Sequence, residues 1–277
     1  MILVTGGSGT VGSEVVKALV AARAPVRAGY RTRPQNVPEG VESVALEYNR
    51  PDTLRPALKD VDRVFLVSNS ITPELTVVDE ARHAGVKRIV KLSVLRAAEE
   101  GYIFARWHRA VERHIEASGL EWTFLRSNGF MQNIVSYMGE TIRTQSAFYS
   151  SGGTGAASHI DVRDLGAVAA SVLLEMGHEG QAYELTGPSA ITYGQIAETL
   201  TTVLGRPIRY VPIAHEQYKR ALLSAGTPEP WADALVDLNR FYAEGHAAEI
   251  SPAVRRVTGR DVIPFAQFAR DHAALLR

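Results

Sequence analysis

Short apolar runs alternate with amphipathic stretches along the first half of the chain. Apolar runs typical of strands occupy residues 1–5, 25–30, 41–46, 63–67, 88–92 and 121–125. Stretches with helical apolar spacing follow the first run from Val11 to Val20 and recur over residues 73–84 and 102–118. The run at 63–67 is too apolar to alternate, as expected of a parallel strand covered on both faces. This order predicts an α/β fold with a doubly wound parallel sheet of the Rossmann type.

The pattern changes after Asn133. A helix is expected over residues 162–175, with Asp161 and Asp164 at its start, where aspartate caps first-turn N–H groups. Beyond Gly187 the chain is mostly helical, with helices expected at 193–204, 216–225, 230–243 and 265–276 and one strand near 208–211. We therefore expect a dinucleotide-binding domain over residues 1–186, with its sheet core in 1–133, and a smaller, mostly helical C-terminal lobe over 187–277.

Charge and cysteine content narrow the class of partner. Lys plus Arg and Asp plus Glu both total 30, so no net field favours nucleic acid or an anionic membrane surface. The chain has no cysteine and no HExxH pattern, so no metal site is expected. No signal-peptide pattern and no apolar run of about 18 residues is present, which favours a cytoplasmic protein without membrane partners. A monomer or a homodimer acting on a small molecule fits these features.

A glycine-rich turn joins the first strand to the first helix. The turn holds the expected dinucleotide-binding residues Gly6, Ser8, Gly9, Thr10, Val11 and Gly12. Glycines at 6, 9 and 12 allow a tight turn, close backbone approach to a pyrophosphate and close helix packing. The helix N-terminus then presents unpaired N–H groups and a positive dipole end to the anion.

Two arginines follow the second strand, where NAD-binding sites usually place an acidic residue for the ribose hydroxyls. Arg31 and Arg33 occupy that place in the stretch YRTR. Arginine binds a 2′-phosphate through two parallel hydrogen bonds, whereas a carboxylate repels it. NADP(H) is therefore the preferred cofactor and NAD(H) remains possible; the alternative is that both arginines are solvated loop residues.

Three stretches carry a family resemblance: TGGSGTVG, HRAVERHIEASGLEWTFLRSNGFMQN and HIDVRDLGAVAA. In order and spacing, over residues 1 to about 185, they resemble the NmrA-like, atypical short-chain dehydrogenase/reductase family. The similarity is greatest to NAD(P)H-dependent quinone and azo- or triphenylmethane-dye reductases, and more distant to regulators that bind the dinucleotide without turnover. The resemblance implies that Val67, Ser68 and Asn69 line the ribose and nicotinamide side, and that Asn128 and Gly129 meet the carboxamide.

The same resemblance bears on catalysis. Counting back from Glu112, the positions of the family's Tyr-x-x-x-Lys pair hold Phe104 and His108. His108 is expected beside the nicotinamide, where an imidazole with a pKa of roughly 6.5 would bind the ribose or donate a proton near neutrality. Ser93 ends a strand and is a second candidate catalytic group, although a serine there equally satisfies local backbone.

Aromatic residues suggest an apolar substrate pocket. The candidates are Phe104, Trp107, Phe130 and Trp231, although an aromatic at any one of these positions is more often plain core. The function that these features favour is an NADPH-dependent reductase for a conjugated acceptor, such as a quinone or enone-like aromatic, without the Tyr–Lys pair. The alternatives are a non-catalytic NADP(H)-sensing regulator and a non-redox biosynthetic enzyme on the same fold.

Overall fold

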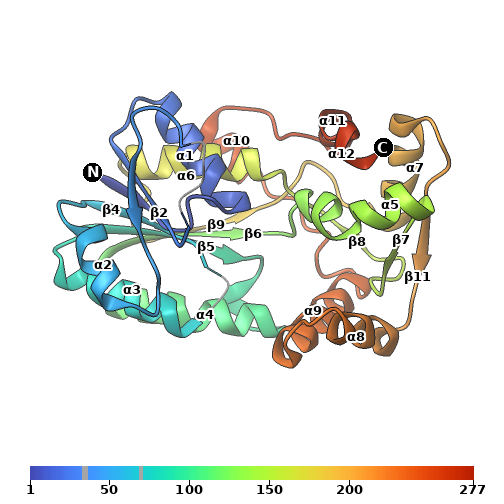
Figure 1. Ribbon diagram of the computed structural model, residues 1–277, viewed down its shortest axis with the longest axis horizontal. Helices are drawn as coiled ribbons and strands as arrows, with labels where there is room; N and C mark the ends of the chain where they lie inside the picture. Colours follow the sequence, from blue (N-terminus) through green and yellow to red (C-terminus); the bar gives the residue numbers. More distant parts are fainter. Residues whose placement is uncertain (33–36, 69–70) are drawn as a thin grey trace.

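A seven-stranded parallel sheet forms the centre of the protein in the computed structural model, which describes residues 1–32, 37–68 and 71–277 (Figure 1). Its strand order is β3-β2-β1-β4-β5-β6-β9. The strands are β1 (Ile2–Val4), β2 (Val26–Tyr30), β3 (Glu42–Ala45), β4 (Arg63–Leu66), β5 (Arg88–Val94), β6 (Glu121–Ser127) and β9 (Gln181–Leu185). The predicted doubly wound α/β fold is confirmed. The inner strands are buried on both sides because helices cover both faces of the sheet.

Helices pack on the two faces as in other doubly wound sheets (Figure 1). One face carries α1 (Thr10–Ala21), α6 (Val162–Leu174) and α10 (Ala253–Thr258); the other carries α2 (Pro51–Leu58), α3 (Ile71–His83) and α4 (Ile103–Ala117). The Asp161 carboxylate caps α6 by accepting from the backbone N–H of Arg163 at 2.9 Å, so the predicted helix start at Asp161 is confirmed.

The remaining elements form the end of the molecule beyond the carboxyl edge of the sheet (Figure 1). They include a 3₁₀ turn η1 (Ala97–Glu99), a π-helical turn η2 (Ile134–Met138), α5 (Gly139–Gln145), α7 (Tyr193–Leu204), α8 (His215–Ser224), α9 (Glu229–Ala243), α11 (Phe265–Asp271) and α12 (Ala273–Leu276). Strand β7 (Ala147–Ser150) pairs in parallel with β11 (Arg209–Pro212), and β8 (Ala156–Ala157) pairs antiparallel with β10 (Ile191–Thr192). Helix α8 has no fully buried residue and packs on α9, which in turn contacts α4.

Several elements differ from the sequence-based expectation. Helix α2, strand β9 and the short strands β7, β8 and β10 were not predicted, and the helix expected over 265–276 is broken at His272. The division at residue 186 stays a prediction. Two strand pairs, β7 with β11 and β8 with β10, cross it.

Candidate active site

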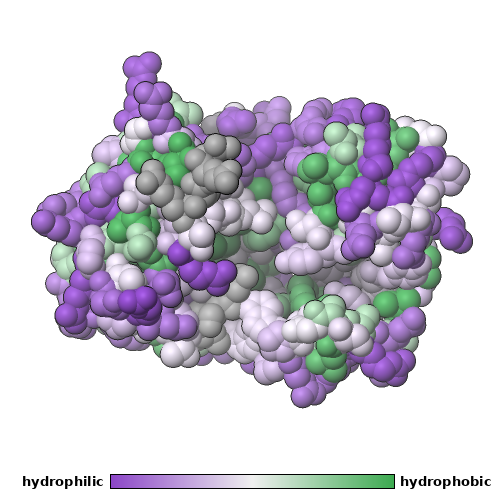
Figure 2. Space-filling view, in the orientation of Figure 1, coloured by the Kyte–Doolittle hydropathy of each residue, from purple (hydrophilic) through white to green (hydrophobic). Residues whose placement is uncertain are grey.

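A cleft of about 760 Å³ opens at the carboxyl ends of β1, β2 and β4, where a doubly wound sheet binds its ligand. Figure 2 shows the surface hollowed near the middle of the molecule, between the sheet and the C-terminal helices. The lining residues are Gly6, Ser8, Gly9, Thr10, Val11, Gly12, Gly29, Arg31, Thr32, Leu46, Glu47, Tyr48, Asn49, Val67, Ser68, Pro73, Leu92, Phe130, Asn133 and Tyr137. The six predicted residues of the glycine turn are all among them.

The glycine turn leaves a cradle of backbone at one end of the cleft. Gly6 has a φ of +62°, in the left-handed region that favours glycine. A Cβ on Gly12 would lie 2.2 Å from the carbonyl oxygen of Gly6, so only glycine fits there. Gly9 caps α1 without any side-chain hydrogen bond, which leaves the first-turn N–H groups of the helix open toward the cleft. This geometry suits a phosphate or pyrophosphate.

Arg31 lines the same cleft immediately after β2. Its side chain is exposed and, among the residues that the structure describes, has no hydrogen-bond or ion-pair partner. A free guanidinium beside the phosphate cradle suits an additional phosphate on the adenosine ribose. Arg33, the second predicted arginine, lies outside the described residues.

Tyr48 forms part of the cleft wall and was missed by the sequence analysis. Its hydroxyl donates to the carbonyl oxygen of Val67, and burial raises its pKa, so the phenol stays protonated. Thr5 ties the ends of β1 and β4 together, because its Oγ1 donates to the carbonyl of Phe65 and accepts from the N–H of Val67, both at 3.0 Å. Asn49, next to Tyr48, also lines the cleft. Tyr48 follows closely after β3, and this position at the carboxyl end of a strand was the signal by which it could have been predicted.

Asn128, Gly129 and Phe130 follow β6 and were predicted to lie at the ligand, but only one of the three lines the cleft. Phe130 lines the cleft, and the neighbouring Asn133 and Tyr137 extend the wall without having been predicted. Asn128 instead donates from Nδ2 to Ser158 Oγ and to the Ala247 carbonyl, both at 2.9 Å.

The backbone N–H of Gly129 is likewise committed to the protein, because it donates to Asn128 Oδ1 at 2.8 Å. A Cβ on Gly129 would lie 2.4 Å from the hydroxyl of Tyr242, so this position is packed against the C-terminal segment. The side-chain amide of Asn128 thus joins β6 to later parts of the chain, and the Gly129 N–H bonds the adjacent Asn128, while a contact of these residues with the carboxamide stays a prediction. Val67 and Ser68 do line the cleft, and Asn69 lies outside the described residues.

Ser93 does not face the cleft. It is buried, and its Oγ donates to Glu112 Oε1 on α4 at 2.7 Å. Glu112 is also held by Arg126, whose Nη2 lies 2.8 Å from Glu112 Oε2. The predicted substrate contact by Ser93 is replaced by a structural bond between β5 and α4.

His108 is partly exposed on α4, but its Nδ1 is buried and has no hydrogen-bond partner among the described residues. Burial, followed by the charge of Lys91, lowers the pKa of His108 well below its usual value. The imidazole is therefore neutral at pH 7. The expectation that it acts as an acid titrating near neutrality is corrected on this point.

Three of the four aromatic candidates form a cluster between α4 and α9. The ring centroids of Phe104 and Trp231 are 5.2 Å apart, those of Phe104 and Trp107 5.4 Å, and those of Trp107 and Trp231 5.7 Å. These spacings are typical of packed aromatic pairs. None of the three lines the 760 Å³ cleft, where Phe130 is the aromatic candidate that does.

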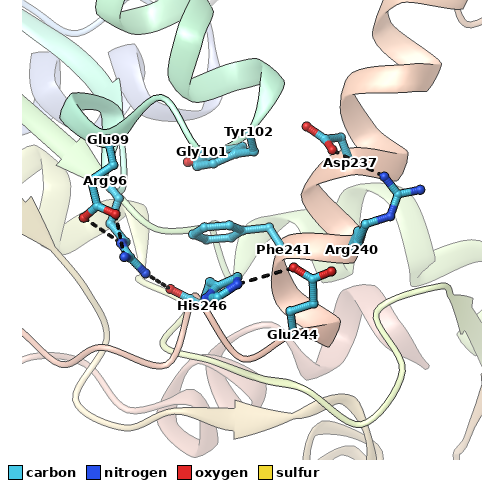
Figure 3. A pocket seen from close by; sticks show the side chains of 9 residues that line it. All are labelled: Arg96, Glu99, Gly101, Tyr102, Asp237, Arg240, Phe241, Glu244 and His246. Atoms are coloured by element: carbon cyan, nitrogen blue, oxygen red, sulfur yellow. Dashed lines mark hydrogen bonds and ion pairs between the residues drawn. The ribbon is translucent and has the colours of Figure 1, made fainter.

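A second pocket, of about 280 Å³, lies between the loop before α4 and the end of α9 (Figure 3). Its charged groups pair with one another: Arg96 with Glu99, Arg240 with Asp237, and His246 with Glu244. It therefore offers no uncompensated charge to a dinucleotide. Within residues 1–32, 37–68 and 71–277, no group of acidic and histidine side chains is placed to hold a metal ion, and no helix is long and apolar enough to span a membrane.

The large cleft fits a phosphorylated dinucleotide. The open N-terminus of α1 could hold the pyrophosphate, Arg31 could hold a ribose phosphate, and Val67 and Ser68 could line the middle of an extended ligand. Phe130 and Tyr137 line part of the cleft from the chain beyond β6. The arrangement can hold a nicotinamide dinucleotide with an acceptor beside it.

Comparison with known proteins places these features in a family. The chain is 40% identical over 283 aligned residues to an NAD(P)H azoreductase of Xenophilus azovorans, covering 99% of this chain and 98% of that protein. It superimposes on the NADPH-dependent quinone oxidoreductase of Escherichia coli complexed with NADPH with a TM-score of 0.86 at 27% identity, covering 99% of this chain and 100% of the other. The triphenylmethane reductase of Citrobacter sp. complexed with NADP(H) gives 0.84 at 29% identity, covering 98% and 99%.

The family model itself spans most of the chain. Residues 1–260 match the model of the NmrA-like family, which extends the resemblance beyond residue 185 into the C-terminal segment. The match thus includes the glycine turn, the cleft and most of the elements beyond the sheet. The protein is a member of the NmrA-like family.

Proposed function

We propose that this protein uses NADPH to reduce a conjugated small-molecule acceptor, such as a quinone or an enone-like aromatic. Its family and its relatives make it an NAD(P)H-dependent reductase of the quinone and dye reductase type. One observation carries the proposal: the uncapped N-terminus of α1 lines the same cleft as Arg31, which has no hydrogen-bond or ion-pair partner within the described part of the chain. Together they suit a dinucleotide with a third phosphate.

Different residues of the chain would then bind different parts of the dinucleotide. The glycine turn binds the pyrophosphate, and Arg31, with Arg33, binds the 2′-phosphate. Val67, Ser68 and Asn69 hold the ribose and nicotinamide side. Phe130 and Tyr137 cover the flat acceptor, because aromatic walls exclude water and orient planar rings.

A conjugated acceptor fits the absence of a tyrosine and lysine at positions 104 and 108. The bound nicotinamide supplies hydride, and the reduced acceptor carries a delocalised negative charge. A delocalised anion needs a weaker acid than the alkoxide from a simple ketone does. Positioning of the acceptor in the cleft then provides most of the acceleration.

The test is a steady-state assay with purified protein, in which loss of NADPH absorbance is followed against quinones, enones and azo and triphenylmethane dyes. We expect saturable turnover with at least one conjugated acceptor, none with simple ketones, and tighter calorimetric binding of NADPH than of NADH. Tight NADPH binding without turnover would refute the reductase and favour the dinucleotide sensor.

We also expect a cytoplasmic monomer or homodimer without nucleic-acid or membrane partners, in keeping with the zero formal charge.

A further inference from the structure

The chain beyond β6 forms one side of the cleft with little packing of its own. Phe130, Asn133 and Tyr137 line the cleft from this segment, and Tyr137 lies on η2 with 81% of its side chain exposed. A ring with so few contacts is positioned by the backbone that carries it. Within the described part of the chain, Gln132 is the one residue of segment 130–138 whose side chain hydrogen-bonds to another segment.

Gln132 lies where the segment passes from one apolar core to another. Phe130 packs against the core that includes α1 and α6, whereas Met131 belongs to the core formed by α5, α7 and α11. Two backbone hydrogen bonds of 2.9 Å join Gly129 and Met131 to Ile160, just before α6. The side chain of Gln132 continues this attachment to the first residues of α6, one turn before η2.

The partners of Gln132 require a side chain that both donates and accepts. Its Nε2 donates to Asp161 Oδ1 at 2.9 Å, and its Oε1 accepts from the N–H of Val162, the first residue of α6, at 3.2 Å. Burial raises the pKa of Asp161, but hydrogen bonds from Arg163 and Gln132 hold it below its usual value, so the group is a carboxylate that only accepts. A neutral amide meets both partners, whereas a glutamate adds a second anion and a lysine cannot accept.

Helix α6 connects this attachment to the dinucleotide site. It packs along α1, and Leu165 and Val168 share a core with Val15 and Leu19 of α1. The open N-terminus of α1 lines the cleft. A movement of the segment relative to α6 would therefore change the separation of an acceptor from the bound dinucleotide, and a displacement of about 1 Å can cost roughly 100-fold in rate.

We propose that Gln132 is a positioning residue that fixes the Tyr137 side of the acceptor space relative to the dinucleotide. The inference rests on the proposed function and adds to it the residue that sets the fit of the acceptor. Gln132 is not among the residues that line the cleft, so it acts through Phe130 and Tyr137 and not by touching a ligand. Rigid planar acceptors depend on it most, because a flat ring needs an aromatic wall at a defined distance from the nicotinamide.

Gln132→Met tests this role, because it keeps the length of the side chain but removes the donor and the acceptor. We expect kcat/KM for a quinone that the wild type reduces to fall about 10- to 100-fold, while the Kd of NADPH changes less than about twofold. Hydrogen exchange followed by mass spectrometry should be faster over residues 129–138. Gln132→Asn keeps the amide on a side chain one methylene shorter, so it should give a smaller loss, and it provides the same comparison if the first variant does not fold.

Gln195→Met is the matched control. Gln195 caps α7 in a similar way, because its Oε1 accepts from the Thr192 N–H at 2.8 Å, and it is not among the residues that line the cleft. Both substitutions should lower Tm, since each removes hydrogen bonds at a helix N-terminus. Only Gln132→Met should change the acceptor kinetics and the exchange over 129–138.

Two outcomes would overturn the positioning role of Gln132. The first is wild-type kcat/KM or wild-type exchange over 129–138 in folded Gln132→Met. The second is an equal kinetic loss in Gln195→Met, which would indicate a general effect of stability. If the wild type turns over no acceptor, the proposed function fails and the role in reduction fails with it, whereas failure of the inference alone leaves a variant with wild-type activity.

Discussion

We expect the preference for NADPH to depend on the exposed guanidinium of Arg31. Arg31→Asp replaces it with a carboxylate at the end of β2, facing the same cleft. A charged hydrogen-bonded contact contributes about 1.5 to 3 kcal/mol, and the exposure of Arg31 places its contribution near the lower value. Repulsion between the new carboxylate and a ribose phosphate adds about 1 kcal/mol in solvent-like dielectric.

NADPH should therefore lose about 2 to 3 kcal/mol of binding free energy, or roughly 30- to 150-fold in Kd. NADH carries a 2′-hydroxyl, which the aspartate can accept, so its Kd should change less than about threefold. Isothermal titration calorimetry with both nucleotides measures the two constants directly. Raising the salt concentration should narrow the difference between wild type and variant for NADPH, because exposed charges are screened.

Arg50→Asp is the matched control. Arg50 is an exposed arginine next to the cleft residue Asn49, but it does not line the cleft and already pairs with Asp52. The same charge change there should leave both affinities close to the wild-type values. Equal losses of NADPH and NADH in Arg31→Asp, or an NADPH loss matched by Arg50→Asp, would refute the assignment of Arg31 to the 2′-phosphate.

Three further substitutions test the structure. Gly12→Ala puts a methyl 2.2 Å from the Gly6 carbonyl oxygen and should abolish nucleotide binding and lower stability by about 1 to 3 kcal/mol; normal calorimetric titration would contradict the turn geometry. Burial raises the pKa of Asp164, whose carboxylate accepts from the Ile263 N–H, to about 6. An acid with a raised folded pKa loses stability as pH rises from its unfolded value of 3.8 to about 6, so Asp164→Asn should be more stable than wild type at pH 7 and show a flatter Tm profile. Trp231→Ala should lower the unfolding free energy by about 2 to 4 kcal/mol while NADPH affinity stays unchanged; a large loss of affinity would place the ring at the ligand.

The sheet and the glycine turn were predictable because their determinants are local. Strand β4 is apolar from Val64 to Leu66, and the first turn of α1 needs glycine at position 12 for contacts within the turn itself. The cap at Asp161 was predictable for the same reason, since its partner lies two residues away. Helix α2 contains Pro51 and Pro56 and has only eight residues, so its apolar spacing is too short to recognise.

The parts of the site that were not predicted depend on partners far along the chain. Ser93 looks like an open strand-end hydroxyl until Glu112 is brought against it, and the partner of Asn128 at Ala247 is 119 residues away. Lys91 is the clearest example of a residue whose environment could not be predicted from the sequence. A lysine within an apolar strand is typical of an edge or surface position. Only the folded structure shows that Lys91 is fully buried against Glu74.

Helix α10 has a consequence for recombining this protein with its relatives. Although it follows the C-terminal elements in sequence, it packs on α6 and β9, and Ala253 and Val254 belong to the same apolar core as α1. In a chimera that joins the first 186 residues to the C-terminal part of another protein, the helix equivalent to α10 would come from that other protein. This helix would then have to pack on α6 and β9 of the present chain. Exchanging acceptor specificity between family members should succeed only when residues 253–258 stay with the parent that supplies α6.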